Sequence, residues 1–271
     1  MTAAYYELLD AADPLGERFA ATDLTRGTWS SKIQHGAPVS ALLVRALEHT
    51  DARPDTRLSR VVIDLLGPVP VEGPLWVRSR IERGGRQIEL VGAELLAPGP
   101  DEAPRPVARA TGWRLQTQDT PAVEHASAPP LRPVDEARAT DMFRSWDRNY
   151  VHSVDWRWLT TPLAPGDGES WIMPVVDLVT GESMTPLQRL FAVADDANGV
   201  GTKLDTTTWT FLNTDLVVHL HRIPEGDWIG IRAQTNYGPD GIGTALGTLF
   251  DQRGAVAAIQ QSVLVRRREP K

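Results

Sequence analysis

The most constraining feature of this 271-residue sequence is an internal repeat. A proline-rich stretch, residues 117–133, has no sustained apolar period and is typical of an extended linker between two parts of similar length. Each part contains an amphipathic helix followed by a β-rich run, and each run carries an Asp-Leu-aliphatic motif. In the first part Trp76 follows Asp64 by 12 residues, and in the second Trp228 follows Asp215 by 13.

The two helices are indicated by the spacing of apolar side chains. In the first part these recur at positions i, i+3, i+4, i+7 and i+8 from Val39 to Leu47. The second helix is expected over 185–199. It opens with Thr185-Pro186-Leu187-Gln188, a capping box with proline at the first helical position.

Each part therefore combines one helix with several long antiparallel strands. A single helix cannot cover such a sheet unless the sheet curls around it. Two such units side by side predict an α+β protein with a double hot-dog fold, in which two antiparallel sheets join into one and wrap around two central helices. We expect a hot-dog unit over 1–116, a linker over 117–140 and a second hot-dog unit over 141–271, which carries the candidate catalytic residues.

Composition excludes several classes of function. The 28 Lys and Arg against 35 Asp and Glu give a net charge of −7, and the only dense basic run is 266–268, so nucleic acid is not an expected partner. Cysteine is absent, which excludes disulfides, thiolate metal sites and a thiol nucleophile. No charged start leads into an apolar run, and no stretch approaches the roughly 20 apolar residues that cross a bilayer. We therefore expect a cytoplasmic protein with no membrane partner.

No metal or cofactor site is expected either. His219 and His221 share one face of a predicted strand, but no third ligand lies at a suitable spacing. The glycines at 238, 241 and 243 lie between strands rather than before a helix, so they are no dinucleotide-binding loop.

Two adjacent aspartates near the end of the second helix are the first candidate site. At about 100° per residue, Asp195 borders the apolar stripe that contains Leu187 and Phe191, whereas Asp196 lies opposite that stripe. We expect Asp195 to line a cavity between the two parts and Asp196 to be mostly exposed. A carboxylate at such a border is either a paired structural residue or a working acid or base, and the spacing leaves both open.

Gln261 is the second candidate. It interrupts an apolar strand and shares a face with Ile259 and Val263, which predicts that it is at least partly buried. A buried amide needs partners, so it either pairs with main-chain groups or orients a water or a substrate.

Several short motifs, taken in their order and spacing, resemble those of the double hot-dog acyl-CoA thioesterases related to bacterial thioesterase II, and more closely their actinobacterial thioesterase-like relatives. The motifs are Trp29, His35-Gly36, Trp156-x-Trp158, Pro186-Leu187-Gln188-Arg189, Ala194-Asp195-x-x-Asn198-Gly199, Asn213-Thr214-Asp215-Leu216, His221-Arg222 and Gln261-Ser262. The resemblance covers nearly the whole chain.

The resemblance implies hydrolysis of an acyl-CoA thioester in lipid metabolism, without a cofactor. An aspartate, a threonine and a glutamine hold the attacking water in that family. These roles carry over onto Asp195, with Asp196 as the one-residue alternative, and onto Gln261. The threonine position is Asn213 here, which departs from the pattern but can still form hydrogen bonds. His35 and Gly36, before the first helix, are expected to bind substrate, because N–H groups at a helix start can polarise a carbonyl.

Two other functions are open. A catalytically silent protein that binds acyl-CoA or an acyl carrier would retain the fold, and the Asn213 departure favours it. A hot-dog hydratase acting on an enoyl-CoA would need an aspartate–histidine pair. The segment Asp196-Ala197-Asn198 has no histidine soon after it, which argues against a hydratase. Assembly into a homo-oligomer is left open.

Overall fold

The fold is built on one large, mostly antiparallel sheet. The computed structural model describes residues 3–139 and 149–268. Its strands are β1 (Ala4–Asp10), β2 (Glu17–Ala21), β3 (Thr56–Leu65), β4 (Pro74–Arg83), β5 (Ile88–Pro98), β6 (Pro104–Gln116), β7 (Arg138–Ala139), β8 (Val154–Trp158), β9 (Gly168–Pro174), β10 (Asp177–Val179), β11 (Trp209–Asn213), β12 (Asp215–Leu220), β13 (Ile229–Tyr237), β14 (Ile242–Asp251) and β15 (Gly254–Arg267). The helices are α1 (Gly36–His49), α2 (Asn149–His152), α3 (Pro186–Ala194) and α4 (Ala197–Gly201).

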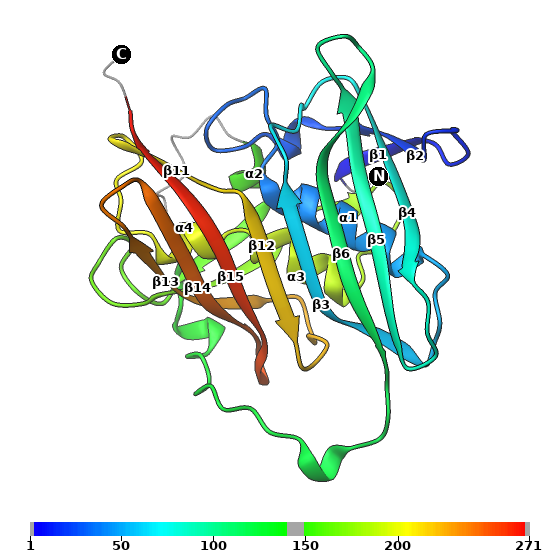
Figure 1. The fold of residues 1–271 in the computed structure, drawn as a ribbon. Helices are drawn as coiled ribbons and strands as arrows, with labels where there is room; N and C mark the ends of the chain where they lie inside the picture. Colours follow the sequence, from blue (N-terminus) through cyan, green and yellow to red (C-terminus); the bar gives the residue numbers. More distant parts are fainter. Residues whose placement is uncertain (1–2, 140–148, 269–271) are drawn as a thin grey trace.

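The strand order is β10-β1-β2-β4-β5-β6-β3-β12-β15-β14-β13-β9-β8-β7, and β11 also pairs with β15 (Figure 1). Among the described strands only β1 and β10 run parallel. This confirms the predicted large antiparallel sheet. None of the helices in the described ranges is both long and apolar enough to cross a membrane.

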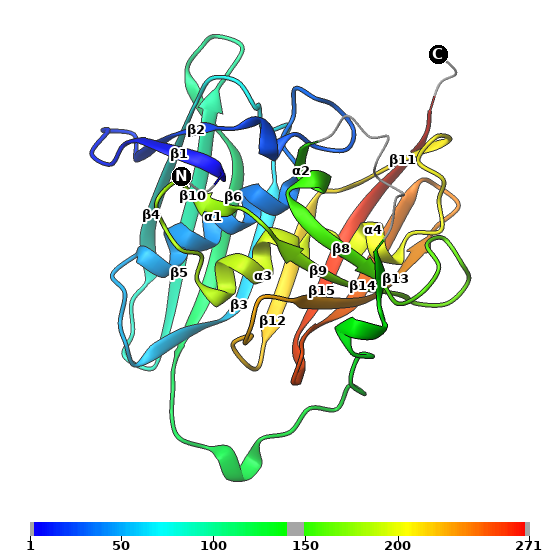
Figure 2. The same cartoon turned by 180° about the vertical axis from the view of Figure 1, so that it is seen from behind.

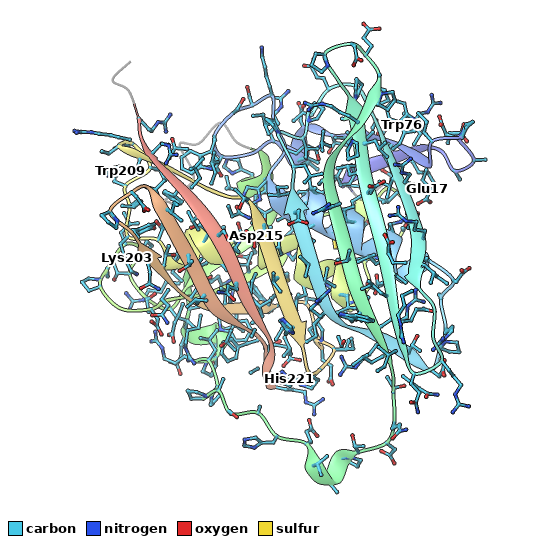
Figure 3. All side chains as sticks on the ribbon, viewed as in Figure 1. Glu17, Trp76, Lys203, Trp209, Asp215 and His221 are labelled. Atoms are coloured by element: carbon cyan, nitrogen blue, oxygen red, sulfur yellow. The ribbon has the colours of Figure 1, made fainter. Side chains whose placement is uncertain are left out.

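The two repeats meet at the pairing of β3 with β12. The strands are antiparallel, and Asp215 lies opposite Asp64 in their register. The two copies of the Asp-Leu-aliphatic motif therefore face each other across the seam, and Figure 3 shows Asp215 near the middle of the molecule. Pairing of equivalent strands is the arrangement that makes one continuous sheet from two repeated units.

Helix α1 is almost entirely buried against the sheet. Its N-cap is His35, whose side chain accepts a hydrogen bond from the N–H of Ala37. Leu42, Leu43 and Leu47 are fully buried, and α1 packs on β3, β4, β5 and β6. Burial of each leucine contributes roughly 1.5–3 kcal/mol to the stability of the fold.

Helix α3 lies against α1 (Figure 2). The predicted capping box is confirmed: Thr185 accepts from the N–H of Gln188, and the side chain of Gln188 accepts from the N–H of Thr185. The Thr185 hydroxyl and the Gln188 amide also donate to the carboxylate of Glu48 on α1, at 2.8 and 2.9 Å. The cap of one helix is thereby tied to the other helix.

A buried ion cluster fixes the far side of α1. Arg45 is 3% exposed and its guanidinium contacts Glu17 of β2 at 2.8 Å and Glu182 at 2.7 Å. Glu182 follows β10, the strand through which the second part of the chain pairs with β1. The cluster therefore links three segments that are far apart in the sequence.

The predicted helix over 185–199 is wrong as one continuous element. Helix α3 ends at Ala194 and α4 begins at Ala197, so Asp195 and Asp196 occupy the break between them. Consequently the expected exposure of Asp196 is also wrong: Asp196 is 5% exposed and Asp195 is 6% exposed. Both residues keep α-region backbone angles, but the N–H of Asp196 turns to the main-chain oxygen of Val193, and Tyr150 covers the side on which Asp196 was expected to be exposed.

The proline-rich stretch 117–133 runs along the outside of the molecule from the end of β6 (Figure 1). Near its end Leu131 packs with Trp171 and Phe250. The indole N–H of Trp171 also donates to the main-chain oxygen of Arg132. The predicted boundary between residues 140 and 141 lies outside the described residues.

Candidate active site

A cavity of about 520 Å³ lies where the N-terminus of α1 meets the turn between α3 and α4. Much of its wall is apolar, including Trp29, Val39, Leu65, Val69, Val151, Trp156, Trp158 and Phe211. Trp29 packs edge-on against Phe211, with ring centroids 5.1 Å apart. A few polar side chains also line it: His35, Asp195, Asp196, Asn198 and Asn213. An apolar cavity with a small polar group is the usual form of a small-molecule site.

Asp195 lines this cavity, as predicted. Its carboxylate oxygen Oδ1 accepts a hydrogen bond of 2.6 Å from the amide of Asn213, the last residue of β11. The carboxylate also lies directly on Gly36, where a Cβ atom would come within 2.6 Å of Oδ2. Only glycine allows this approach to the first residue of α1. The positive end of the α1 dipole then favours the negative charge.

Gln261 is completely buried, which confirms the prediction made from its strand. It does not reach the Asp195 carboxylate. Its Nε2 donates to the main-chain oxygen of Asp195 at 3.2 Å, and its Oε1 has no partner among the described residues. Gln261 therefore lies behind the turn that carries the aspartates rather than in the lining of the cavity.

His35 comes from the first part of the chain and lies between the two carboxylates. Its Nδ1 is 3.6 Å from Asp195 Oδ2, and its Nε2 is 3.7 Å from Asp196 Oδ1. Because Nδ1 accepts the N–H of Ala37, the neutral ring carries its hydrogen on Nε2. Burial lowers the pKa of His35, and the charge of Asp195 opposes that shift.

Asp196 faces Tyr150, a residue that sequence reasoning missed. The Tyr150 hydroxyl lies 2.6 Å from Asp196 Oδ2, and the Tyr150 ring stacks on His35 with centroids 3.9 Å apart and an angle of 8°. Burial raises the pKa of Asp196, and the neighbouring Asp195 raises it further, whereas the hydrogen bond between Asp196 and Tyr150 opposes this rise. No sequence pattern links Tyr150, in a four-residue helix, to the aspartates 46 residues later.

Five residues proposed from sequence thus gather around one turn. Asp195, Asn213, His35 and Gly36 line the cavity, and Gln261 supports it from behind. His219 and His221 lie elsewhere, in and just after β12, and both are exposed. Figure 3 shows His221 at the lower end of that strand, and its Nε2 contacts the main-chain oxygen of Ala255 at 2.9 Å.

Two family models match most of the chain. The acyl-CoA thioesterase N-terminal domain matches residues 25–115, and the acyl-CoA thioesterase C-terminal domain matches residues 126–265. No curated protein matches the chain by sequence.

Three solved structures illustrate the likeness in fold. A candidate thioesterase II from Thermobifida fusca is 19% identical, with a TM-score of 0.73 over 97% of this chain and 96% of that chain. A conserved protein of unknown function with a hot-dog fold from Alicyclobacillus acidocaldarius is 13% identical, with a TM-score of 0.72 over 96% and 95%. A candidate thioesterase from Novosphingobium aromaticivorans is 19% identical, with a TM-score of 0.71 over 96% and 98%. At these identities the likeness shows a shared hot-dog fold.

Proposed function

Because this chain belongs to the acyl-CoA thioesterase family, as its motifs predicted, we propose that it hydrolyses an acyl-CoA thioester to a free acid and coenzyme A by attack of water. The observation that carries the proposal is the buried Asp195 carboxylate, which Asn213 holds at 2.6 Å against the start of α1 in an apolar cavity. A fixed carboxylate in such a place can take a proton from water.

The chemical step needs no other reactant. Asp195 accepts a proton as the water oxygen bonds to the thioester carbon, and the negative charge develops on the carbonyl oxygen. We assign the stabilisation of that oxygen to the N–H of Gly36, at the positive end of α1, and His35 borders the same space. The carbon–sulfur bond then breaks, and the proton held by Asp195 passes to the departing thiolate of coenzyme A.

Asn213 and Gln261 serve this base in different ways. Asn213 donates to the carboxylate itself, so the asparagine that replaces the family's threonine still engages the base. Gln261 holds the main chain of Asp195 from behind the turn, outside the lining of the cavity. Both residues therefore orient the Asp195 carboxylate and do not react themselves.

For the fold, we infer two hot-dog units, residues 1–116 and 141–271 joined by 117–140, that form a double hot-dog around α1 and α3. On the basis of its family, we infer a cytoplasmic enzyme of lipid metabolism that uses no metal or cofactor, with acyl-CoA as its partner molecule. Nucleic acid and membranes are not expected partners.

The test is thiol release from a panel of acyl-CoAs with short, medium, long and aromatic acyl groups. The wild-type protein should hydrolyse at least one of them, and Asp195→Asn should reduce its kcat by about 10²–10⁴-fold with an unchanged melting temperature. Wild-type rates no higher than those of Asp195→Asn across the whole panel would contradict hydrolysis. Acyl-CoA binding by both proteins would then support the silent binder.

One observation favours a second candidate, a hydratase acting on enoyl-CoA. The histidine that the sequence lacks after Asn198 is supplied in space by His35, within 3.7 Å of both aspartates. However, Nδ1 of His35 is engaged by the N–H of Ala37. Loss of the ultraviolet absorbance of an enoyl-CoA without thiol release would identify hydration.

A further inference from the structure

Tyr150 and Asp196 form a buried pair beside the proposed base. The Tyr150 hydroxyl oxygen lies 2.6 Å from Asp196 Oδ2 and 2.9 Å from the main-chain oxygen of Ala192. Tyr150 is fully buried and Asp196 is 5% exposed. A phenol has a single hydrogen to donate, whereas both neighbouring oxygens lie at hydrogen-bond distance. A single hydrogen cannot make a full hydrogen bond to both oxygens, so full bonds in both contacts require a second hydrogen from another group.

The carbonyl of Ala192 cannot supply it, because a carbonyl oxygen only accepts. That carbonyl is also one of the last four of α3, which a helix leaves without a donor from its own next turn. Tyr150 satisfies it. The hydrogen in the contact of 2.6 Å then has to come from Asp196, as a carboxylic acid that donates to the tyrosine oxygen.

The contact of Asp196 Oδ1 with His35 agrees with a protonated Asp196 carboxyl. Nδ1 of His35 is occupied by the N–H of Ala37, so the ring hydrogen lies on Nε2, which faces Asp196 Oδ1 at 3.7 Å. A neutral acid accepts at this oxygen and donates at the other.

We propose that Asp196 is held as a neutral carboxylic acid that donates its proton to Tyr150, so that the two adjacent aspartates carry one negative charge and this charge lies on Asp195. Asp196 is then a positioning residue. It keeps a second charge away from the base and holds the stacked Tyr150 and His35 rings in place. Two neighbouring carboxylates that both ionise would repel each other, and a neutral Asp196 removes this repulsion.

The surroundings of Asp196 agree with this protonation state. The titratable groups that face it in the described part of the chain are His35 before α1, Tyr5 of β1, Tyr150 of α2 and Asp195 in the same turn. None of the arginines and lysines in the described ranges forms an ion pair with it. Burial, the largest cause, raises the pKa of the Asp196 carboxyl.

The first test measures stability and does not depend on activity. Asp196→Asn keeps a donor toward Tyr150 and an acceptor toward His35, but it cannot titrate. In the wild type the folded state holds one more proton than the unfolded state above the ordinary aspartate pKa. The ratio of wild-type to Asp196→Asn unfolding constants should therefore increase by about tenfold per pH unit between about pH 5 and pH 7.

Asp195→Asn is the matched control on the adjacent residue. It leaves the Asp196 proton in place. The ratio of the Asp195→Asn to the Asp196→Asn unfolding constant should therefore also increase with pH at the acidic end of this window. A wild-type to Asp196→Asn ratio that is constant with pH would overturn the proposal. An infrared band of a protonated carboxylic acid should be present at neutral pH in the wild type and absent in Asp196→Asn, and its persistence in the variant would also refute it.

The second test rests on the proposed thioester hydrolysis. Asp196→Ala should reduce kcat by about 10²-fold, because it removes the hydrogen bond with Tyr150 and the contact with His35 that position the site. Asp196→Asn should restore kcat to within about tenfold of the wild type, whereas Asp195→Asn should not. Equal losses in Asp195→Asn and Asp196→Asn would mean that the charge is not confined to Asp195. If the wild type hydrolyses no acyl-CoA, the proposed function fails while the pH dependence of stability still decides the protonation state.

Discussion

Gly36→Ala tests whether the position of the Asp195 carboxylate determines the rate of hydrolysis. The added Cβ would lie 2.6 Å from Oδ2 and 2.8 Å from both Oδ1 and Cγ of Asp195. Ordinary van der Waals contact begins at 3.4 Å, so the carboxylate must retreat by about 0.8 Å, the difference between 3.4 and 2.6 Å. The backbone itself is unstrained, because Gly36 is the first residue of α1 and its φ is not positive.

The expected loss in kcat follows from this displacement of the carboxylate. A retreat of this size separates the carboxylate from the Asn213 amide or moves both groups away from the bound water. Misplacement by about 1 Å can cost about 10²-fold in rate, so we expect kcat to fall by about 30–100-fold. The fold should tolerate the change, because only the end of one side chain moves and alanine is favoured over glycine in a helix by up to about 1 kcal/mol.

The assay compares kcat for thiol release with the melting temperature. Gly199→Ala is the matched control, because Gly199 lies in α4 beside the same cavity and a Cβ there meets nothing within 4 Å. Its kcat should stay within about threefold of the wild type, since no catalytic group has to move. Wild-type kcat in Gly36→Ala would show that the placement of the Asp195 carboxylate does not limit the rate, and would refute the reasoning.

Three further predictions concern the support of the site. Gln261→Ala should lower kcat by about 10–100-fold, whereas Gln260→Ala, on the exposed face of the same strand, should not. Combined with Asp195→Asn, the loss of Gln261 should add little, since Gln261 acts only through the position of Asp195. Arg45→Met should destabilise the protein by about 1.5–3 kcal/mol in urea unfolding, because it removes charge-assisted hydrogen bonds to two partly exposed glutamates, and equal midpoints would contradict a stabilising role. Burial lowers the pKa of His35, so folding favours its neutral form, and the His35 contribution to stability should fall as the pH drops from the ordinary histidine pKa toward the folded one. The ratio of wild-type to His35→Asn unfolding constants should therefore rise as the pH drops over this range, opposite in sign to the effect of Asp196, and a constant ratio would contradict it.

Much of the fold could be predicted because it is encoded locally and twice. The apolar spacing in α1, the capping box at Thr185 and the repeated Asp-Leu-aliphatic motif each specify an element from a few consecutive residues. Their repetition predicted a large antiparallel sheet, and the pairing of Asp64 with Asp215 joins the copies at equivalent strands. Alternation along β15 likewise predicted the burial of Gln261.

The error at Asp196 has a clear physical origin. A helical projection gives the direction of a side chain but not what packs there: α3 ends at Ala194, and Tyr150 of α2 covers Asp196 in the turn that follows. Both aspartates lie in the break, and both side chains turn inward. The apolar spacing continues from Thr185 to Gly199, and no proline follows Pro186, so this pattern predicts one uninterrupted helix.

Residue patterns along the chain were enough to predict the repeat, the helix from Val39 to Leu47, the capping box at Thr185, the thioesterase family and the candidate residues Asp195, Asn213 and Gln261. The packing of distant segments places His35 between two carboxylates, Gly36 against one of them and Tyr150 against the other, and no residue pattern indicated these contacts. Short-range order depends on neighbours along the chain, which a pattern of residues records. The protonation states in the site depend on burial and on contacts between segments more than 40 residues apart, and these arise only when α1, α2 and the α3–α4 turn pack together.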